Sequence, residues 1–265
     1  MRKLGYPAAV MGLSLCDTVF LIEAAVGNVW YCLDVAHIAF AGMLLLLFSA
    51  GARPVPAFTR NWQAQQDDAG PPVRNATQLR TLLMGMLFMA LAVKPAGFAA
   101  AASAIWAAAG TMMLWFIRGW RTGKALFNPL LAAQHLAFVW LAFGTLAFGA
   151  AGLGIIAYPV PDTLHANTIG AMTGFIMAIS VRAGSHRPDG EMRAGAGFTA
   201  GCTLVWLAAC TRLAPPLLPA FSQSLTTTAA VLWCAGWLAF IAAFLPALSG
   251  PIRRPVLSGR SSGRL

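Results

Sequence analysis

Four histidines are the side chains of this chain best suited to hold a metal ion or a haem iron: His37, His135, His165 and His186. A neutral imidazole offers a nitrogen lone pair to iron, copper or zinc. The sequence has no HExxH and no CxxCH motif, which argues against a zinc protease and a c-type haem. The five cysteines have no CxxC spacing, so they indicate apolar packing rather than a disulfide or zinc framework.

The segments that carry these histidines are predicted to cross a membrane. Hydrophobic residues make up 58% of the 265-residue chain and charged residues 10%, whereas a soluble domain carries about 25% charged residues. Apolar runs recur that are long enough, at about 1.5 Å per helical residue, to cross a hydrocarbon core about 30 Å thick. The chain is therefore predicted to be an all-α, polytopic integral membrane bundle, with residues 1–265 forming a single transmembrane domain.

Hydropathy predicts eight transmembrane helices and a cytoplasmic tail at 249–265. The helices are expected at about 5–27, 30–51, 77–93, 97–117, 129–153, 163–182, 195–213 and 225–248. Residues 53–75 are rich in Pro, Gly and polar side chains and are predicted to form an inner-surface connection.

The positions of the basic residues favour this count, because short cytoplasmic segments are enriched in Lys and Arg. With both termini in the cytoplasm, all of the 18 Lys and Arg residues except Lys94 and Arg212 fall on the inner side. The formal charge of +10 is thus explained by topology. No nucleic-acid partner is expected, because such binding needs basic residues gathered on one soluble face.

The predicted topology sorts the histidines into two pairs by depth. His37 and His165 lie toward the outer side of their helices, whereas His135 lies about two turns into its helix from the inner side. His186 belongs to the inner loop that follows residue 182. Facing helices of a bundle can build haem or metal sites from such side chains. The alternative for each is a histidine that hydrogen-bonds a helix backbone.

Acidic residues within spans are costly and usually face the bundle interior or water. Asp17 is the only acid well inside a predicted span and is a candidate for a functional or buried polar network. Glu23, Asp34, Lys94 and Arg212 fall near the outer boundary, where an ion pair or a snorkelling side chain is expected.

Three segments resemble the most characteristic elements of the NnrS family and occur in the family's order. They are "RPVPAFTRNWQ" at 53–63, "NPLLAAQHLAFVWLAFG" at 128–144 and "HANTIGAMTGFIMAISVRAGSH" at 165–186. The resemblance extends over about residues 8–244 and corresponds to the C-terminal two thirds of the family.

The resemblance implies a multi-pass protein of the bacterial inner (cytoplasmic) membrane that binds haem and copper. The family is associated with nitric oxide metabolism, denitrification and resistance to nitrosative stress. By motif position, the resemblance implies cofactor-binding roles for His135, His165, His186 and Arg182, with Arg60 and Asn61 as accompanying polar residues in a second shell. Depth alone adds His37 as a metal candidate and Asp17 as a second-shell candidate.

The leading functional hypothesis is a low-polarity haem or copper site with an open position for a small neutral ligand such as nitric oxide. Because the family's reaction is not defined, enzymatic activity is left open. One alternative is a small-solute transporter, although the sequence lacks the paired discontinuous spans of an inverted repeat. The other is a shortened, cofactor-free member with a structural or partner-binding role, since the family's first spans have no counterpart here. A separate polypeptide that supplies those helices is then an expected partner.

Overall fold

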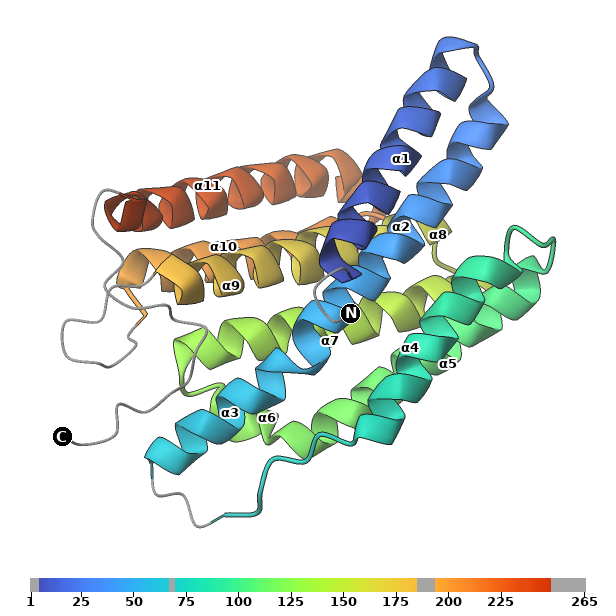
Figure 1. The fold of residues 1–265 in the computed structure, drawn as a ribbon. Coiled ribbons are helices and arrows are strands. Elements are labelled where there is room, and N and C mark those ends of the chain that lie inside the picture. The colour runs from blue at the N-terminus through green and yellow to red at the C-terminus, as the bar shows by residue number, and fades with distance from the viewer. Residues whose placement is uncertain (1–4, 67–69, 185–193, 249–265) are drawn as a thin grey trace.

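The computed structural model describes residues 5–66, 70–184 and 194–248, and within these ranges every regular element is a helix (Figure 1). In chain order the elements are α1 (Gly5–Ala25), α2 (Val29–Ala52), α3 (Pro54–Gln65), α4 (Thr77–Val93), α5 (Ala99–Ile117), η1 (Arg118–Trp120), α6 (Thr122–Ala125), α7 (Pro129–Gly152), α8 (Val160–His165), η2 (Ala166–Thr173), α9 (Gly174–Gly184), α10 (Ala196–Arg212), η3 (Pro219–Phe221) and α11 (Ser222–Leu248).

The described helices confirm the predicted all-α membrane bundle. Six helical segments are long and apolar enough to cross a membrane: Pro7–Ala25, Val29–Gln65, Ala99–Trp120, Pro129–Gly152, Val160–Arg182 and Pro219–Leu245. Thr77–Val93 is apolar but shorter. Each of the eight predicted spans overlaps a helix of the structure. The count of eight crossings and the cytoplasmic position of both termini stay predictions.

The predicted connection at 53–75 contains a helix that the sequence analysis did not expect. After a break at Arg53, the chain continues from α2 into α3, which begins at Pro54. Proline is tolerated in the first turn of a helix because its missing N–H has no partner there. The buried residues Val55, Thr59 and Gln63 follow one another at a spacing of four, so one face of α3 packs against the bundle.

Helix α7 is the central element, with α2, α3, α5, η2 and α9 packed around it. Glycines allow the closest of these contacts. A Cβ at Gly149 would collide with the backbone of Ala107 on α5, and a Cβ at Gly110 would collide with the backbone of Leu146 on α7. Small residues let two membrane helices approach to backbone contact. The α5–α7 pair therefore forms a tightly packed wall of the bundle.

One span is interrupted by a π-helix. The predicted helix at 163–182 is made of α8, the π-helix η2 and α9. The Thr173 hydroxyl donates to the Thr168 carbonyl five residues earlier, at 3.3 Å. π-helical turns are rare and often lie at functional sites. This one follows His165 directly, in the segment that carries the most characteristic family resemblance.

The bundle has two ends with different charge. One end, called the basic end here, holds α3, residues 118–124, the first turns of α7 and the last turn of α9. The other, called the far end, holds residues 23–34, Lys94, residues 158–165 and Arg212 (Figure 1). The positive-inside rule predicts that the basic end faces the cytoplasm.

Candidate functional site

His135 lies in a closed polar cluster at the basic end. Its side chain is fully buried. The Thr59 hydroxyl of α3 lies 2.7 Å from Nε2, and the Thr122 hydroxyl of α6 lies 2.9 Å from Nδ1. The indole of Trp120 packs edge-on against the imidazole at 6.0 Å between ring centroids. Three segments that are distant in the sequence thus meet at this one ring.

The hydrogen bonds of the two threonines determine which nitrogen of His135 carries the proton. Thr59 has a single hydroxyl proton, which it donates to the Val55 carbonyl at 3.0 Å. Nε2 must then donate to the Thr59 oxygen, and Nδ1 accepts from Thr122. Both ring nitrogens of this neutral imidazole are therefore occupied. His135 has no lone pair available to a metal ion unless the Thr122 hydroxyl moves away.

Arg182 lies at the same end but is not one of the hydrogen-bonding or ring partners of His135. Its guanidinium lies over the ring of Phe58, 3.6 Å from the centroid, and so joins α9 to α3. Arg60 and Asn61 follow Thr59 in the sequence, yet both are exposed on the opposite side of α3. Their prediction as second-shell residues stays a prediction, and the buried polar contact of α3 is made by Thr59.

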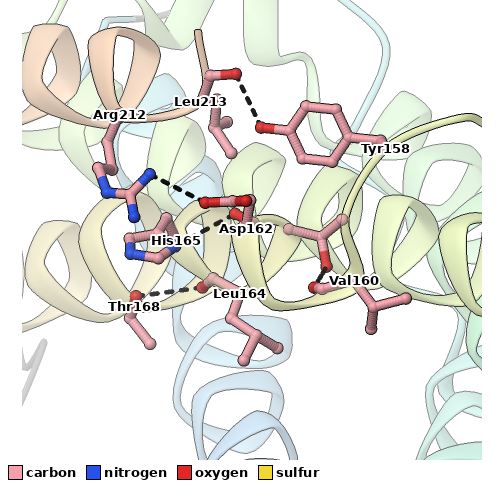
Figure 2. A network of polar contacts seen from close by, with 9 residues as sticks. Tyr158, Val160, Asp162, Leu164, His165, Thr168, Arg212 and Leu213 are labelled. Atoms are coloured by element: carbon pink, nitrogen blue, oxygen red, sulfur yellow. Dashed lines mark hydrogen bonds and ion pairs between the residues drawn. The ribbon is translucent and has the colours of Figure 1, made fainter. Parts of the chain in front are cut away.

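His165 lies in a second polar cluster at the far end (Figure 2). Arg212 of α10 forms an ion pair with Asp162 of α8 at 3.0 Å. The Tyr158 hydroxyl donates to the Leu213 carbonyl at 2.7 Å. The pKa of Tyr158 is raised above its ordinary value, mainly by burial and also by the Asp162 carboxylate. The Arg212 guanidinium offsets part of this shift. These contacts fasten the loop before α8 to the end of α10, and the His165 ring lies beside the Arg212 guanidinium.

The imidazole of His165 differs from that of His135 in one decisive respect. Its Nδ1 lies 3.2 Å from the Asp162 carbonyl, which can only accept, so Nδ1 carries the proton and Nε2 carries the lone pair. No hydrogen bond to Nε2 occurs within the described part of the chain (Figure 2). Metal-binding histidines commonly donate their other ring N–H to a backbone carbonyl in this way. The half-buried His165 is therefore in the form that can bind a metal.

The two clusters are too far apart to share one metal ion. Asn167 packs on Gly144, and Gly174 packs on Ala137, which sets the antiparallel register of the α7 pairing. At about 1.5 Å per residue, this register separates the levels of His165 and His135 by about 15 Å. The described residues also contain no group of three or more His, Cys, Asp and Glu side chains that could hold a metal ion.

The remaining predicted residues lie elsewhere. His37 of α2 is partly exposed, and its Nδ1 lies 2.7 Å from the Leu33 carbonyl of its own helix, so its Nε2 also carries the lone pair. Asp17 is exposed on α1. His186 lies outside the described residues.

The boundary ion pair that was expected for Arg212 is present, with Asp162 as its partner. Burial lowers the pKa of Lys94 below its ordinary value, and the nearby Asp34 carboxylate offsets part of that shift. Both groups lie at the far end, where the sequence analysis expected paired or snorkelling charges. Asp162 itself was missed, although it precedes His165 by three residues and therefore lies on the same face of the helix.

Sequence reasoning also missed Asn167, the second residue of the π-helix. Its side chain is fully buried, and neither its amide oxygen nor its amide nitrogen has a hydrogen-bond partner among the described residues. Such groups are rare in folded proteins and call for a specific reason. Asn167 lies in the family-like segment at 165–186, but only its packing against Gly144 reveals that it is buried.

The fold and the site define the class of protein. It is a polytopic α-helical membrane protein with one imidazole cluster at each end, one of them buried and the other half-buried. The family model described as NnrS protein matches residues 1–251, nearly the whole chain. The chain therefore belongs to the NnrS family. Neither the curated proteins nor the solved structures that were compared with the chain gave a match.

Proposed function

We propose that this chain is an NnrS-like protein of the bacterial inner membrane that binds haem or copper through His165 and takes part in nitric oxide metabolism or nitrosative-stress resistance. The single observation that carries the proposal is the state of the His165 ring. Its Nδ1 proton is held by the Asp162 carbonyl, and its Nε2 lone pair has no partner in the described residues. Membership of the NnrS family supports the choice of cofactors.

The donor set of this cluster would hold a cofactor through one imidazole. One imidazole can hold a haem iron, as in many haem proteins, or serve as one ligand to copper. Arg212 and Asp162 neutralise each other at 3.0 Å, so the cluster adds little net charge beside a cofactor. A bound group would supply a coordination position that is open to a small neutral ligand such as nitric oxide.

The chain's own residues hold the imidazole in place. The Asp162 carbonyl fixes the tautomer and the direction of the ring, and the Arg212 ion pair fixes the first turn of α8 against α10. His37 of α2 is in the same tautomer and at the same end of the bundle, but it is not part of this cluster and is assigned no part in holding the cofactor. His135 is assigned the lesser part, because both of its nitrogens are occupied.

The proposal is tested by cofactor content. The chain is expressed in a haem-replete, copper-supplied bacterium and purified in detergent, and the Soret absorbance and the copper per chain are measured. His165→Ala is expected to lose the bound cofactor. His37→Ala is the matched control, because it removes a ligand-ready imidazole that lies outside the His165 cluster. Wild-type protein that is colourless and free of copper, or a His165→Ala variant with full occupancy, would contradict the proposal.

Colourless protein would instead favour the second candidate, a cofactor-free family member that acts through a partner. The observation in its favour is helix α1, whose span Pro7–Ala25 has no buried residue in the described structure. A membrane helix that bears an exposed acid at Asp17 is better accommodated against another polypeptide than in lipid. Co-purification of a defined partner with wild type, and its loss with Asp17→Leu, would support this role.

A further inference from the structure

A groove of about 380 Å³ runs between α7, the η2–α9 segment and α10. Its volume falls within the range of about 300–1,000 Å³ that is typical of ligand pockets. The floor is made of small residues, which include Ala133 and Ala137 of α7 and Gly170 and Gly174 of the opposing span. The walls are largely apolar, and none of the three histidines that the structure describes lines the groove.

The groove is about as long as one membrane leaflet is thick. On α7 it extends from Pro129, the first residue of the helix at the basic end, to Trp140 at its middle. At about 1.5 Å per residue this length is about 16 Å. Half of a hydrocarbon core about 30 Å thick is about 15 Å. The groove thus has the length and the depth of one acyl chain that enters from the interface at the basic end.

The end of the groove that lies away from the basic end is lined by aromatic side chains. Trp140 and Trp206 line it and contact each other, with ring centroids 6.1 Å apart. Gly170 packs directly on the Trp140 ring, where a Cβ would collide with it. A chain lying in the groove would therefore end against two indole rings.

The end of the groove at Leu126 and Pro129 directly follows a basic segment of the chain. Residues 118–124, which lead into α7, contain Arg118, Arg121 and Lys124 and no acidic residue. Leu126, two residues beyond Lys124, lines the mouth of the groove and is 44% exposed. Basic residues at a membrane surface attract anionic lipids.

We propose that this groove is a specific site for an anionic phospholipid of the leaflet at the basic end, which the positive-inside rule predicts to be the cytoplasmic leaflet. One acyl chain occupies the groove as far as Trp140 and Trp206. The phosphate lies at the interface beside residues 118–124. Because the groove contains no histidine, the lipid site does not depend on the haem or copper proposal.

Native mass spectrometry of the full chain, released from nanodiscs of phosphatidylglycerol and phosphatidylcholine in equal amounts, tests the site. Wild type is expected to retain one phosphatidylglycerol. Ala133→Phe places a ring in the floor of the groove and is expected to abolish retention. Ala200→Phe is the matched control, because Ala200 is an exposed residue of α10 that does not line the groove, and it is expected to behave as wild type.

A second filling variant, Thr203→Phe on the opposite wall, keeps the test decisive if Ala133→Phe does not fold. Quenching of tryptophan fluorescence by chain-brominated phosphatidylglycerol adds a positional readout, and a smaller quench in Trp206→Phe is expected. Equal retention by wild type and both filling variants would overturn the site. Equal retention of phosphatidylcholine and phosphatidylglycerol would overturn the anionic selectivity, and a retained molecule other than a phospholipid would overturn the assigned occupant. Cofactor content measured on the same samples separates this outcome from that of His165.

Discussion

His135 and His165 lie on two helical segments that pack against each other, yet their imidazoles are prepared for different roles. His135 is fully buried and hydrogen-bonded through both nitrogens to hydroxyl groups. His165 is half-buried, gives its Nδ1 proton to a backbone carbonyl and keeps its Nε2 lone pair. The difference teaches that the availability of a membrane histidine depends on where its second nitrogen bonds. Burial and depth alone do not decide it.

The His135 cluster is best understood as a connection among three segments. Its ring joins α3, α6 and α7 through Thr59 and Thr122, and Trp120 closes the remaining side. A buried polar group that loses its partner costs about 1–3 kcal/mol. Each member of this cluster therefore depends on the others. The His165 cluster, in contrast, joins α8 to α10 mainly through an ion pair, and its imidazole is not needed for that connection.

The largest expected effect follows from removal of the His135 ring. His135→Ala leaves a cavity and removes the imidazole partner of the buried Thr59 hydroxyl and the half-buried Thr122 hydroxyl, and we expect a loss of about 3 kcal/mol in the free energy of unfolding. The measurement is thermal unfolding in detergent, compared with His165→Ala. If His165→Ala in cofactor-free protein destabilised the chain as much, the contrast between the two clusters would be wrong.

The second effect sharpens the comparison by making His135 resemble His165. Thr122→Val keeps the shape of the side chain but removes the hydroxyl that donates to Nδ1. We expect a loss of about 1–2 kcal/mol in stability, because the Nδ1 acceptor is left buried without a donor. Thr111→Val is the control, since the Thr111 hydroxyl bonds only its own helix on an exposed face. Equal losses in both variants would show that Thr122 has no special role.

A smaller effect is expected when the far-end ion pair is broken. The Arg212 and Asp162 side chains are 22% and 25% exposed, so solvent screens part of their attraction. We expect Arg212→Gln and Asp162→Asn each to cost about 0.5–1 kcal/mol, with a coupling of similar size in the double variant. The double-mutant cycle is measured by chemical unfolding in detergent. Strict additivity would mean that the pair contributes nothing to the attachment of α8.

The smallest effect concerns the pH dependence of the Tyr158 contact. The pKa of Tyr158 is raised above its ordinary value of 10.0, mainly by burial. Its contribution to stability is therefore complete below about pH 10 and is lost as the pH rises through the raised pKa, because the unfolded chain ionises first. Tyr158→Phe is expected to be about 0.5 kcal/mol less stable at neutral pH. That difference should stay constant up to about pH 10 and narrow as the pH rises further in unfolding experiments, and a constant difference would contradict the assignment.

Much of the fold could be predicted from the sequence, because the bilayer imposes a simple rule. A segment that crosses hydrocarbon must satisfy its backbone internally, so a long apolar run such as 129–153 or 225–248 forms a helix whatever its neighbours are. The same reasoning misjudged residues 54–65. There, the prolines and polar residues predict irregular structure, whereas Pro54 begins a helix. One face of that helix is buried against the bundle, and the sequence does not show which face.

The candidate site was predictable only in part. The histidines and the family resemblance are properties of the sequence. The NnrS family model, which matches residues 1–251, confirms the family. The hydrogen-bond partners of each imidazole could not be predicted from the sequence. Thr59 and Thr122, for example, are 76 and 13 residues from His135 along the chain. Their meeting depends on the crossing of α3, α6 and α7, which glycine contacts and side-chain packing determine.

By itself, the sequence determined that this chain is a bundle of membrane helices with its positive charge gathered at one end, because hydropathy and charge act on each segment separately. Only the tertiary structure decided which histidine keeps a free lone pair, and that a groove lies between α7, the η2–α9 segment and α10. Both depend on the distances between side chains of different helices, and the sequence of a single segment does not specify those distances.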